Sequence, residues 1–323
     1  MRGNWYPRGM LAVLVAEASF PERSSAWRFP GAGWVVHTPP RAELVVVDET
    51  LAKRARFQLP SAWRAVHCVT PDLGYAAVSE RDRVLLIDAT GRSVWEVKHH
   101  PWGDSDSECG SCWVSTDGNQ VWATMPNADG PDEWRVIDVR SGRVLDRAAL
   151  ACHAAGSHPL GHPDGLHVGL SVGEGQDGCE VYWGRWNSGR LLVSRLDDRS
   201  RVLADVHPNG RSYFTTPHDG TAVALHAFPG GGVLARQKAE GVLDVDDSYD
   251  FEGGYLTADL VIAGSVEKQS HWLFDSSTLR PIAELRYPRG AVKDCILPNG
   301  RGTWLTSDYL GGTHQVWRLG EPR

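Results

Sequence analysis

A short turn motif that recurs about every 45 residues constrains the fold of this chain more than any other feature. Its copies read TPDLG, STDG, HPDG, HPNG and LPNG, with a degenerate FEGG before the last of them. The final glycines are 44, 47, 45, 44 and 46 residues apart, at Gly74, Gly118, Gly165, Gly210, Gly254 and Gly300. Gly33 lies 41 residues before the first of these. A repeat of this length indicates one supersecondary unit built many times.

Each copy of the motif predicts a tight hairpin. Asp-Gly and Asn-Gly favour the positive φ angles of two-residue turns between antiparallel strands. A short strand follows the turn, as in 75–78 and 121–124. The next strand often ends in aspartate, as at Asp88 and Asp138, and a turn such as 89–91 leads into a fourth strand. Four strands per unit predict an all-β chain folded as a β-propeller with four-stranded antiparallel blades.

The pattern of the repeat resembles the WD-repeat and related propeller superfamilies. The resemblance rests on a (Ser/Thr/His)-Pro-(Asp/Asn)-Gly turn followed by a turn of the form hydrophobic-hydrophobic-Asp-x-x-(Ser/Thr)-Gly. It extends over nearly the whole chain, although strict Trp-Asp dipeptides and Gly-His blade openings are absent. The resemblance implies the architecture and says little about activity, because one fold hosts many functions.

The two ends of the chain indicate the number of blades. The last unit stops after 315–319 without a fourth strand, while a spare apolar strand, 11–15, precedes the first unit near Ser24. Placing the spare strand in the last blade completes seven blades and removes two exposed sheet edges. We therefore predict a single seven-bladed β-propeller over 1–323, its ring closed by the N-terminal strand. The expected blades are 24–62, 63–107, 108–153, 154–199, 200–241, 242–290, and 291–323 plus 9–16.

The expected working face lies opposite the Asp-Gly turns. It carries the connections between blades and between second and third strands, which are longer and richer in polar side chains. Loops on a rigid scaffold are where binding and catalysis usually occur. The inner strands are expected to start near the central channel with His67, Cys68, Ser111, Cys112, His158, Asp205, Asp246, Asp294 and Cys295.

Three functional hypotheses remain open. The leading one is a binding module that holds a peptide, a protein or a small molecule at the loop-rich face and channel mouth. Its candidate ligand-binding residues are Trp102, Asp246, Asp247, Trp183, Trp186, His218, His271 and His314. The alternative is a propeller enzyme, a lyase, hydrolase or oxidoreductase, with a histidine as general base. Its candidate catalytic residues are His67, His158, Asp205 and Asp294. The third is a purely structural scaffold, whose channel would lack functional side chains and whose rim would expose an apolar patch.

Two kinds of divalent metal site are compatible with the sequence, although the cofactor stays unknown. Cys109 and Cys112 form a CxxC that would be half of a zinc site, which Cys152, His153, His158 or Cys179 would complete, and our candidate set is Cys109, Cys112, His153 and Cys179. Two other interpretations of Cys109 and Cys112 are a redox or disulfide pair, and two unrelated cysteines without a shared role. Calcium would suit the acidic loops, whose side chains are Asp104, Asp106 and Glu108, and Asp244, Asp246, Asp247 and Asp250. Solvated acidic turns are the commoner explanation of such loops.

Several other motifs are best explained by structure alone. The GxSxG at 169–173 lies within a predicted strand, whereas a hydrolase elbow needs a strand-to-helix turn. The GxGxxG at 173–178 has no helix after it to receive a phosphate. His162 and His207 precede Pro-(Asp/Asn)-Gly and are expected to be structural.

Composition narrows the class of partner. The chain has 41% hydrophobic and 23% charged residues, which is ordinary for a soluble globular protein. Its net charge of −7 and lack of a Lys/Arg run argue against nucleic acid. The apolar run 10–16 is too short for a membrane span and lacks a convincing cleavage site, so we expect no membrane partner and a cytoplasmic location.

Overall fold

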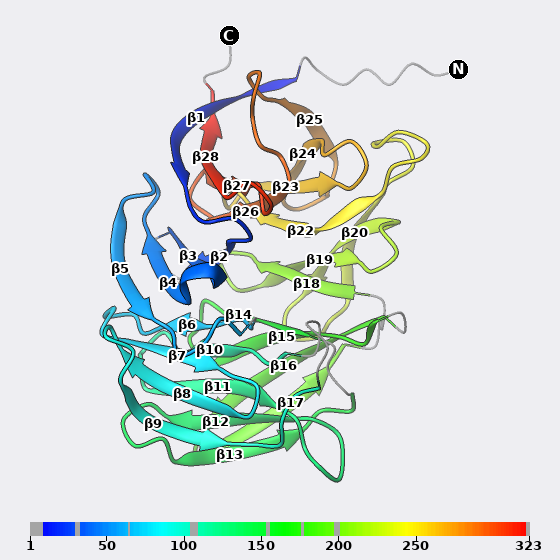
Figure 1. The fold of residues 1–323 in the computed structure, drawn as a ribbon. Helices are drawn as coiled ribbons and strands as arrows, with labels where there is room; N and C mark the ends of the chain where they lie inside the picture. The colour runs from blue at the N-terminus through cyan, green and yellow to red at the C-terminus, as the bar shows by residue number, and fades with distance from the viewer. Residues whose placement is uncertain are drawn as a thin grey trace. The chain divides into compact units, whose positions relative to one another are not determined.

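The computed structural model describes residues 9–29, 33–63, 65–103, 109–152, 156–175, 178–196 and 201–320. These residues form 28 β-strands and one short 3-10 helix, Pro39–Arg41 (Figure 1). No helix in these ranges is long and apolar enough to cross a membrane. The chain divides into two compact units, which are described separately.

The N-proximal unit comprises Phe29–Val47 and Lys53–Arg199. It holds three complete four-stranded antiparallel sheets, each in chain order. Blade 2 is β6 (Cys68–Val69), β7 (Tyr75–Ser79), β8 (Arg83–Asp88) and β9 (Ser93–Lys98). Blade 3 is β10 (Cys112–Val114), β11 (Gln120–Met125), β12 (Glu133–Asp138) and β13 (Val144–Ala149). Blade 4 is β14 (Ser157–Gly161), β15 (His167–Gly173), β16 (Cys179–Asn187) and β17 (Arg190–Arg195).

Blade 1 is the four-stranded sheet that contains the division between the units. It consists of β2 (Ser25–Phe29), β3 (Gly33–Thr38), β4 (Glu43–Val47) and β5 (Lys53–Gln58). β3 and β4 are buried along their whole length, which their run of valines and leucine explains.

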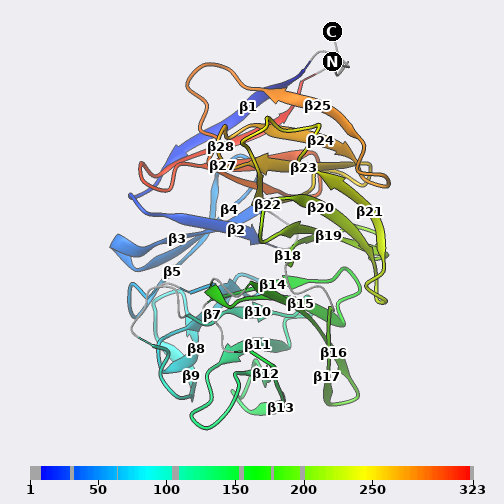
Figure 2. The ribbon, with the colours of Figure 1, turned by 90° about the vertical axis from the view of Figure 1, so that its right-hand side faces the viewer.

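The C-proximal unit comprises Met1–Arg28, Asp48–Ala52 and Ser200–Arg323. Figure 2 shows the four strands of its first sheet, blade 5, side by side. They are β18 (Arg201–Val206), β19 (Ser212–Pro217), β20 (Ala222–Ala227) and β21 (Val233–Lys238). Blade 6 is β22 (Tyr249–Tyr255), β23 (Leu260–Ser265), β24 (His271–Asp275) and β25 (Pro281–Arg286). Blade 7 is β26 (Cys295–Pro298), β27 (Thr303–Ser307), β28 (Thr313–Leu319) and β1 (Met10–Ser19).

The N-terminal strand completes blade 7, as the sequence predicts. β1 pairs antiparallel with β28 from Ala12 to Ser19, and Figure 1 shows the two strands, blue and red, side by side. Its first residues also pair in parallel with β25, Met10 against Leu285 and Leu11 against Arg286. Blades 6 and 7 therefore form one mixed eight-stranded sheet. The fold is a seven-bladed β-propeller closed by the N-terminal strand.

Each blade has two chemically different ends. At the turn end lie the connections from first to second and from third to fourth strand. At the loop end lie the connection from second to third strand and the one to the next blade. The repeated motif forms the turn ends, where Gly118, Gly165 and Gly210 have φ of 71°, 69° and 70°. Such angles are costly for a residue with a Cβ, which explains the recurring glycine.

The degenerate copy of the motif, FEGG, is an exception to the prediction. Residues 251–254 lie inside β22, and the turn of blade 6 is 256–259. The glycines of this copy serve close packing instead of a turn. A Cβ on Gly254 would lie 2.7 Å from Cβ of Asp205, and one on Gly253 would lie 2.6 Å from the carbonyl oxygen of Ile262.

Buried aromatic side chains fill the space between blades within each unit. In the N-proximal unit the rings of Trp122 and Trp134 meet edge to face at 5.3 Å, and both are at most 2% exposed. In the C-proximal unit Trp304 and Trp317 pack with Leu273 and Ile296. The recurring tryptophans are therefore core residues of the sheets.

Candidate functional site

The loop ends of blades 5 to 7 form one connected surface in the C-proximal unit. We call it the loop rim, and it consists of 218–221, 239–248, 266–270, 287–294 and 308–312. The N–H of Tyr249 donates to the carbonyl of Gly220 at 2.9 Å, and the N–H of Val266 donates to that of Ser248 at 3.0 Å. The N–H of Glu267 donates to the Asp247 carboxylate at 3.0 Å. These bonds join the connections of neighbouring blades.

The loop rim is strongly acidic. It carries eight carboxylates and three basic side chains, the carboxylates being Asp219, Glu240, Asp244, Asp246, Asp247, Glu267, Asp294 and Asp308. None of the eight is buried. The bases are Lys268, Arg289 and Lys293, and Lys268 pairs with Asp244. The turn ends of the same blades carry two carboxylates, Asp259 and Asp275, and three arginines, Arg211, Arg280 and Arg301.

A pocket of about 710 Å³ opens on the loop rim at blade 5. Its wall is built by 219–222, by the outer strand β21 and by the connection 239–248. Acidic and basic side chains share the lining, namely Asp219, Glu240, Asp244, Asp247, Arg236 and Lys238. Val245 at its edge is 100% exposed. The pocket combines charged hydrogen-bonding groups with an apolar contact.

An aromatic pair lies beside this pocket. Phe251 in β22 is 47% exposed, although its neighbours Tyr249 and Tyr255 are buried. The His218 ring packs tilted against it with 5.7 Å between centroids. The Thr216 hydroxyl holds this part of β22 by donating to the Phe251 carbonyl at 2.9 Å. An exposed aromatic ring on a fixed strand is a suitable anchor for a partner.

A group of carboxyl and thiol side chains lies where the inner strands β22 and β26 adjoin. The N–H of Ile296 donates to the Glu252 carboxylate at 2.7 Å, and the Cys295 thiol also hydrogen-bonds it. Burial raises the pKa of Glu252 to about 7, and the negative charge of Asp250 contributes. Burial also raises the pKa of Cys295, so this thiol is poorly nucleophilic. Glu252 is not among the residues predicted from the sequence, because the apparent turn motif hides its position in a strand.

The predicted residues of the C-proximal unit fall into two groups. Asp246, Asp247, Asp294 and His218 lie on the loop rim, where Asp294 accepts a hydrogen bond from Gln269. The other three are buried. Asp205 lies near the turn end of β18, and its carboxylate accepts hydrogen bonds from Arg28 Nη1 and from the N–H of Tyr255, both at 2.8 Å.

The two buried histidines of this unit are enclosed by their neighbours. His271 is 1% exposed, its Nδ1 lies 2.5 Å from the Tyr287 hydroxyl, and burial lowers its pKa to about 4. His314 is fully buried against the Phe20 ring at 4.8 Å, and burial lowers its pKa too. Both therefore stay neutral at physiological pH.

The predicted residues of the N-proximal unit are mostly in its core. His67 is fully buried, accepts the N–H of Ser79 at Nδ1, and has a pKa well below its usual value because of burial and of His37 nearby. Trp102 and Trp183 are 3% and 5% exposed. Trp186 is half-buried against the core cluster. His158 in β14 is exposed.

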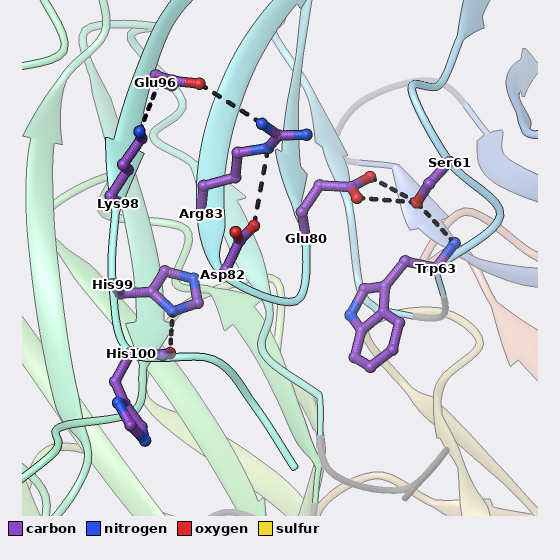
Figure 3. Close-up of polar contacts among 9 residues, drawn as sticks. All are labelled: Ser61, Trp63, Glu80, Asp82, Arg83, Glu96, Lys98, His99 and His100. Atoms are coloured by element: carbon purple, nitrogen blue, oxygen red, sulfur yellow. Dashed lines mark hydrogen bonds and ion pairs between the residues drawn. The ribbon is translucent and has the colours of Figure 1, made fainter. Parts of the chain in front are cut away.

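A polar cluster occupies the loop end of blade 2 (Figure 3). The Ser61 hydroxyl donates to the buried Glu80 carboxylate at 2.8–2.9 Å and accepts the N–H of Trp63 at 3.0 Å. Burial raises the pKa of Glu80, an effect that the Ser61 hydroxyl opposes. Arg83 forms a 3.7 Å ion pair with Glu96. These contacts hold the connection between blades 1 and 2 in place.

The predicted cysteine ligands are not brought together as a group. Cys112 is buried with Cys68 as its electrostatic neighbour, and Cys179 is buried with Cys152 near it. Burial raises the pKa of Cys179 to about 12 and also raises that of Cys109. His153 lies outside the described residues, as do Asp104, Asp106 and Glu108. The described residues contain one group of three possible metal ligands, His162, Asp164 and His167.

Comparison with known proteins supports the fold. No family model matches the chain, and no curated protein matches it in sequence. Among solved structures, the β-propeller domain of Cps50 (Swd1) from Myceliophteria thermophila is similar, with a TM-score of 0.67, 12% identity, and coverage of 96% of this chain and all of that one. The propeller BBS1N, solved in complex with ARL6DN, has a TM-score of 0.59 and 12% identity, covering 97% of this chain and 98% of that one. The predicted β-propeller fold is thereby confirmed.

Proposed function

We propose that this protein is a binding module that holds a protein partner, through an exposed segment of that partner, on the loop rim of blades 5 to 7. The observation that carries the proposal is the charge difference between the two ends of these blades. Eight carboxylates accompany three bases on the loop rim, against two carboxylates and three bases at the turn ends. A surface of one sign attracts and orients a partner of the other.

The chemistry of the loop rim favours a basic peptide segment with an apolar side chain. Asp246 and Asp294 are exposed, and both would attract a cationic segment. Phe251 and Val245 supply apolar contacts beside the pocket. A partner that combines these features gains contact area as well as charge attraction. The similar propeller BBS1N is found in complex with a protein, ARL6DN, which agrees with a role of this kind.

Selection from random peptides tests the proposal, because it assumes nothing about the identity of the partner. A random 12-residue display library is selected on the immobilised chain, and the enriched peptides are synthesised and measured by fluorescence anisotropy. We expect enriched Lys and Arg beside aromatic or aliphatic residues, with affinity that falls as salt rises. Asp246→Lys should weaken binding about fivefold, as expected for reversing one rim charge.

Asp259→Lys provides the matched control. Asp259 is exposed at the turn end of blade 6, and the substitution changes the charge by the same amount as Asp246→Lys. Peptide affinity should be unchanged in this variant. Selected peptides that bind both variants equally, or that protect the turn end from hydrogen exchange, would contradict the proposal.

A further inference from the structure

The turn between β14 and β15 brings two imidazoles and a carboxylate together. The ligand atoms of His162, Asp164 and His167 all lie within 4.8 Å of one another. In the part of the chain that the structure describes, no other set of three His, Cys, Asp or Glu side chains meets this condition. The turn belongs to blade 4 and is separate from the loop rim.

Backbone groups hold the carboxylate in position. Oδ1 of Asp164 accepts the N–H of Leu166 at 2.8 Å and that of His167 at 3.0 Å. Burial raises the pKa of Asp164, but these two bonds and the His167 ring outweigh it and lower the pKa to about 2. Nδ1 of His167 lies 2.7 Å from Oδ2, and Nδ1 of His162 lies 3.0 Å from Oδ1. The anionic ligand is therefore preorganised between two imidazole nitrogens.

The equivalent turn of blade 5 shows what the fold alone requires. There the sequence is His207-Pro208-Asn209-Gly210-Arg211-Ser212. Nδ1 of His207 accepts the N–H of Asn209 at 3.0 Å, and Oδ1 of Asn209 accepts the N–H of Arg211 at 2.8 Å. This turn forms with a neutral amide and a serine. The charge of Asp164 and the ring of His167 are therefore not required for the turn to form.

The three groups of blade 4 are a zinc-type ligand set. Two imidazole nitrogens and one carboxylate oxygen, with water in the fourth position, are a common environment of Zn²⁺. The side chains of His162, Asp164 and His167 are 4%, 34% and 17% exposed, so one side of the group is open to water. A metal at Nδ1 of His162 would replace the long 3.2 Å bond from the Asp164 N–H. We propose that His162, Asp164 and His167 bind a zinc ion at the turn end of blade 4.

Zinc binding to the untagged, chelator-treated protein tests this proposal. We expect one equivalent of Zn²⁺ by calorimetry, a rise in Tm on zinc addition, and a visible Co²⁺ spectrum typical of a four-coordinate site. The key variant is Asp164→Asn combined with His167→Ser, because it gives blade 4 the residues found in the folded turn of blade 5. Its zinc affinity should fall at least about tenfold, while its Tm without zinc stays close to that of the parent.

Cys112→Ala distinguishes this site from the CxxC hypothesis. We expect this variant to keep its zinc, because Cys112 is not among the three ligands. The proposal is overturned if the parent takes up no zinc. It is equally overturned if the double variant retains zinc with unchanged affinity, or if Cys112→Ala alone abolishes binding.

Discussion

The two ends of blades 5 to 7 differ in how many exposed carboxylates they carry. At the turn ends, polar side chains bond to their own backbone, as Asp275 does with the N–H groups of Ser277 and Thr278. The Arg28–Asp205 pair, in which Asp205 is buried and the Arg28 side chain is 34% exposed, lies near these ends too. At the loop ends, Asp219 and Asp247 also bond backbone N–H groups, but charged groups such as Asp246 stay exposed. The loop ends thus leave more charged groups available for recognition.

The connections at the two ends also include different lengths. Turn-end connections such as 207–211 and 299–302 are short, so side chains such as that of Asn209 reach a backbone group of their own turn. The connection 239–248 at the loop end is longer. In it Asp247 bonds the N–H groups of Ser248 and Glu267, whereas Asp246 is exposed. If this comparison is correct, substitutions near the turn ends should change stability, and substitutions on the loop rim should change binding.

The largest loss of stability is expected from Asp205→Ala. The change leaves the Arg28 guanidinium and the N–H of Tyr255 without their buried acceptor. Loss of one partner from a fully buried pair costs about 3–5 kcal/mol, and because the Arg28 side chain is 34% exposed we expect about 2–4 kcal/mol here. Urea unfolding measures the effect. The double variant Arg28→Met/Asp205→Leu should lose less stability than Asp205→Ala. An Asp205→Ala variant as stable as the parent would contradict the proposed difference between the turn ends and the loop ends.

A smaller effect, dependent on pH, is expected at Glu252. Burial raises its folded pKa to about 7, above the ordinary value of 4.5. The folded state therefore holds the proton more tightly, and stability from this group is present below pH 4.5 and is lost as pH rises through 7. Glu252→Gln removes this loss, so at pH 8 the free energy of unfolding of the variant should exceed that of the parent by roughly 1–3 kcal/mol. Unfolding curves at pH 5 and pH 8 check the sign, and an equal effect at both values would contradict the assignment.

Asn209→Ala should cost about 0.5–1 kcal/mol. The change removes the Oδ1 acceptor that closes the turn of blade 5 through the N–H of Arg211. Thermal unfolding measures the loss, with Asn209→Asp as the variant that keeps the acceptor. If both variants were equally destabilised, the turn bond would not be the cause.

The smallest change in stability is expected from Asp246→Lys. The side chain is exposed on the loop rim, so the free energy of unfolding should stay within about 0.5 kcal/mol of the parent. The affinity of this variant for selected basic peptides should nevertheless fall. A large loss of stability here would mean that the loop rim is structural, against the division between the two ends.

The sequence predicts the fold well because the repeat is a local signal. Turns that need glycine at positive φ, such as Gly118 and Gly210, mark blade after blade whatever the long-range contacts are. The failure at 251–254 has a tertiary cause, since Gly254 is small to admit the side chain of Asp205 from another blade. Single-chain spacing cannot reveal that contact.

The candidate site was only partly predictable. Loop position directs attention to segments such as 239–248, but it does not say whether a side chain points outward. His271 and His314 lie at strand starts near the loop ends and are nevertheless buried. A shift of one residue along a strand reverses the face on which a side chain lies. Likewise, the sequence alone assigns His162 a structural role in a turn, because it does not show that His167 lies beside Asp164.

The pairing of β1 with β28 also governs when the molecule can be completed during synthesis. Ser19 and Thr313, which face each other across this pair, are separated by nearly the whole chain. Blades formed by consecutive strands can assemble as they emerge from the ribosome, since their contacts are local. The closing pair must wait for β28, and until then β1 presents an unpaired edge on which Ala12, buried in the finished sheet, is uncovered. The interval between the synthesis of β1 and that of β28 is thus the period in which this edge is open to pairing with other chains.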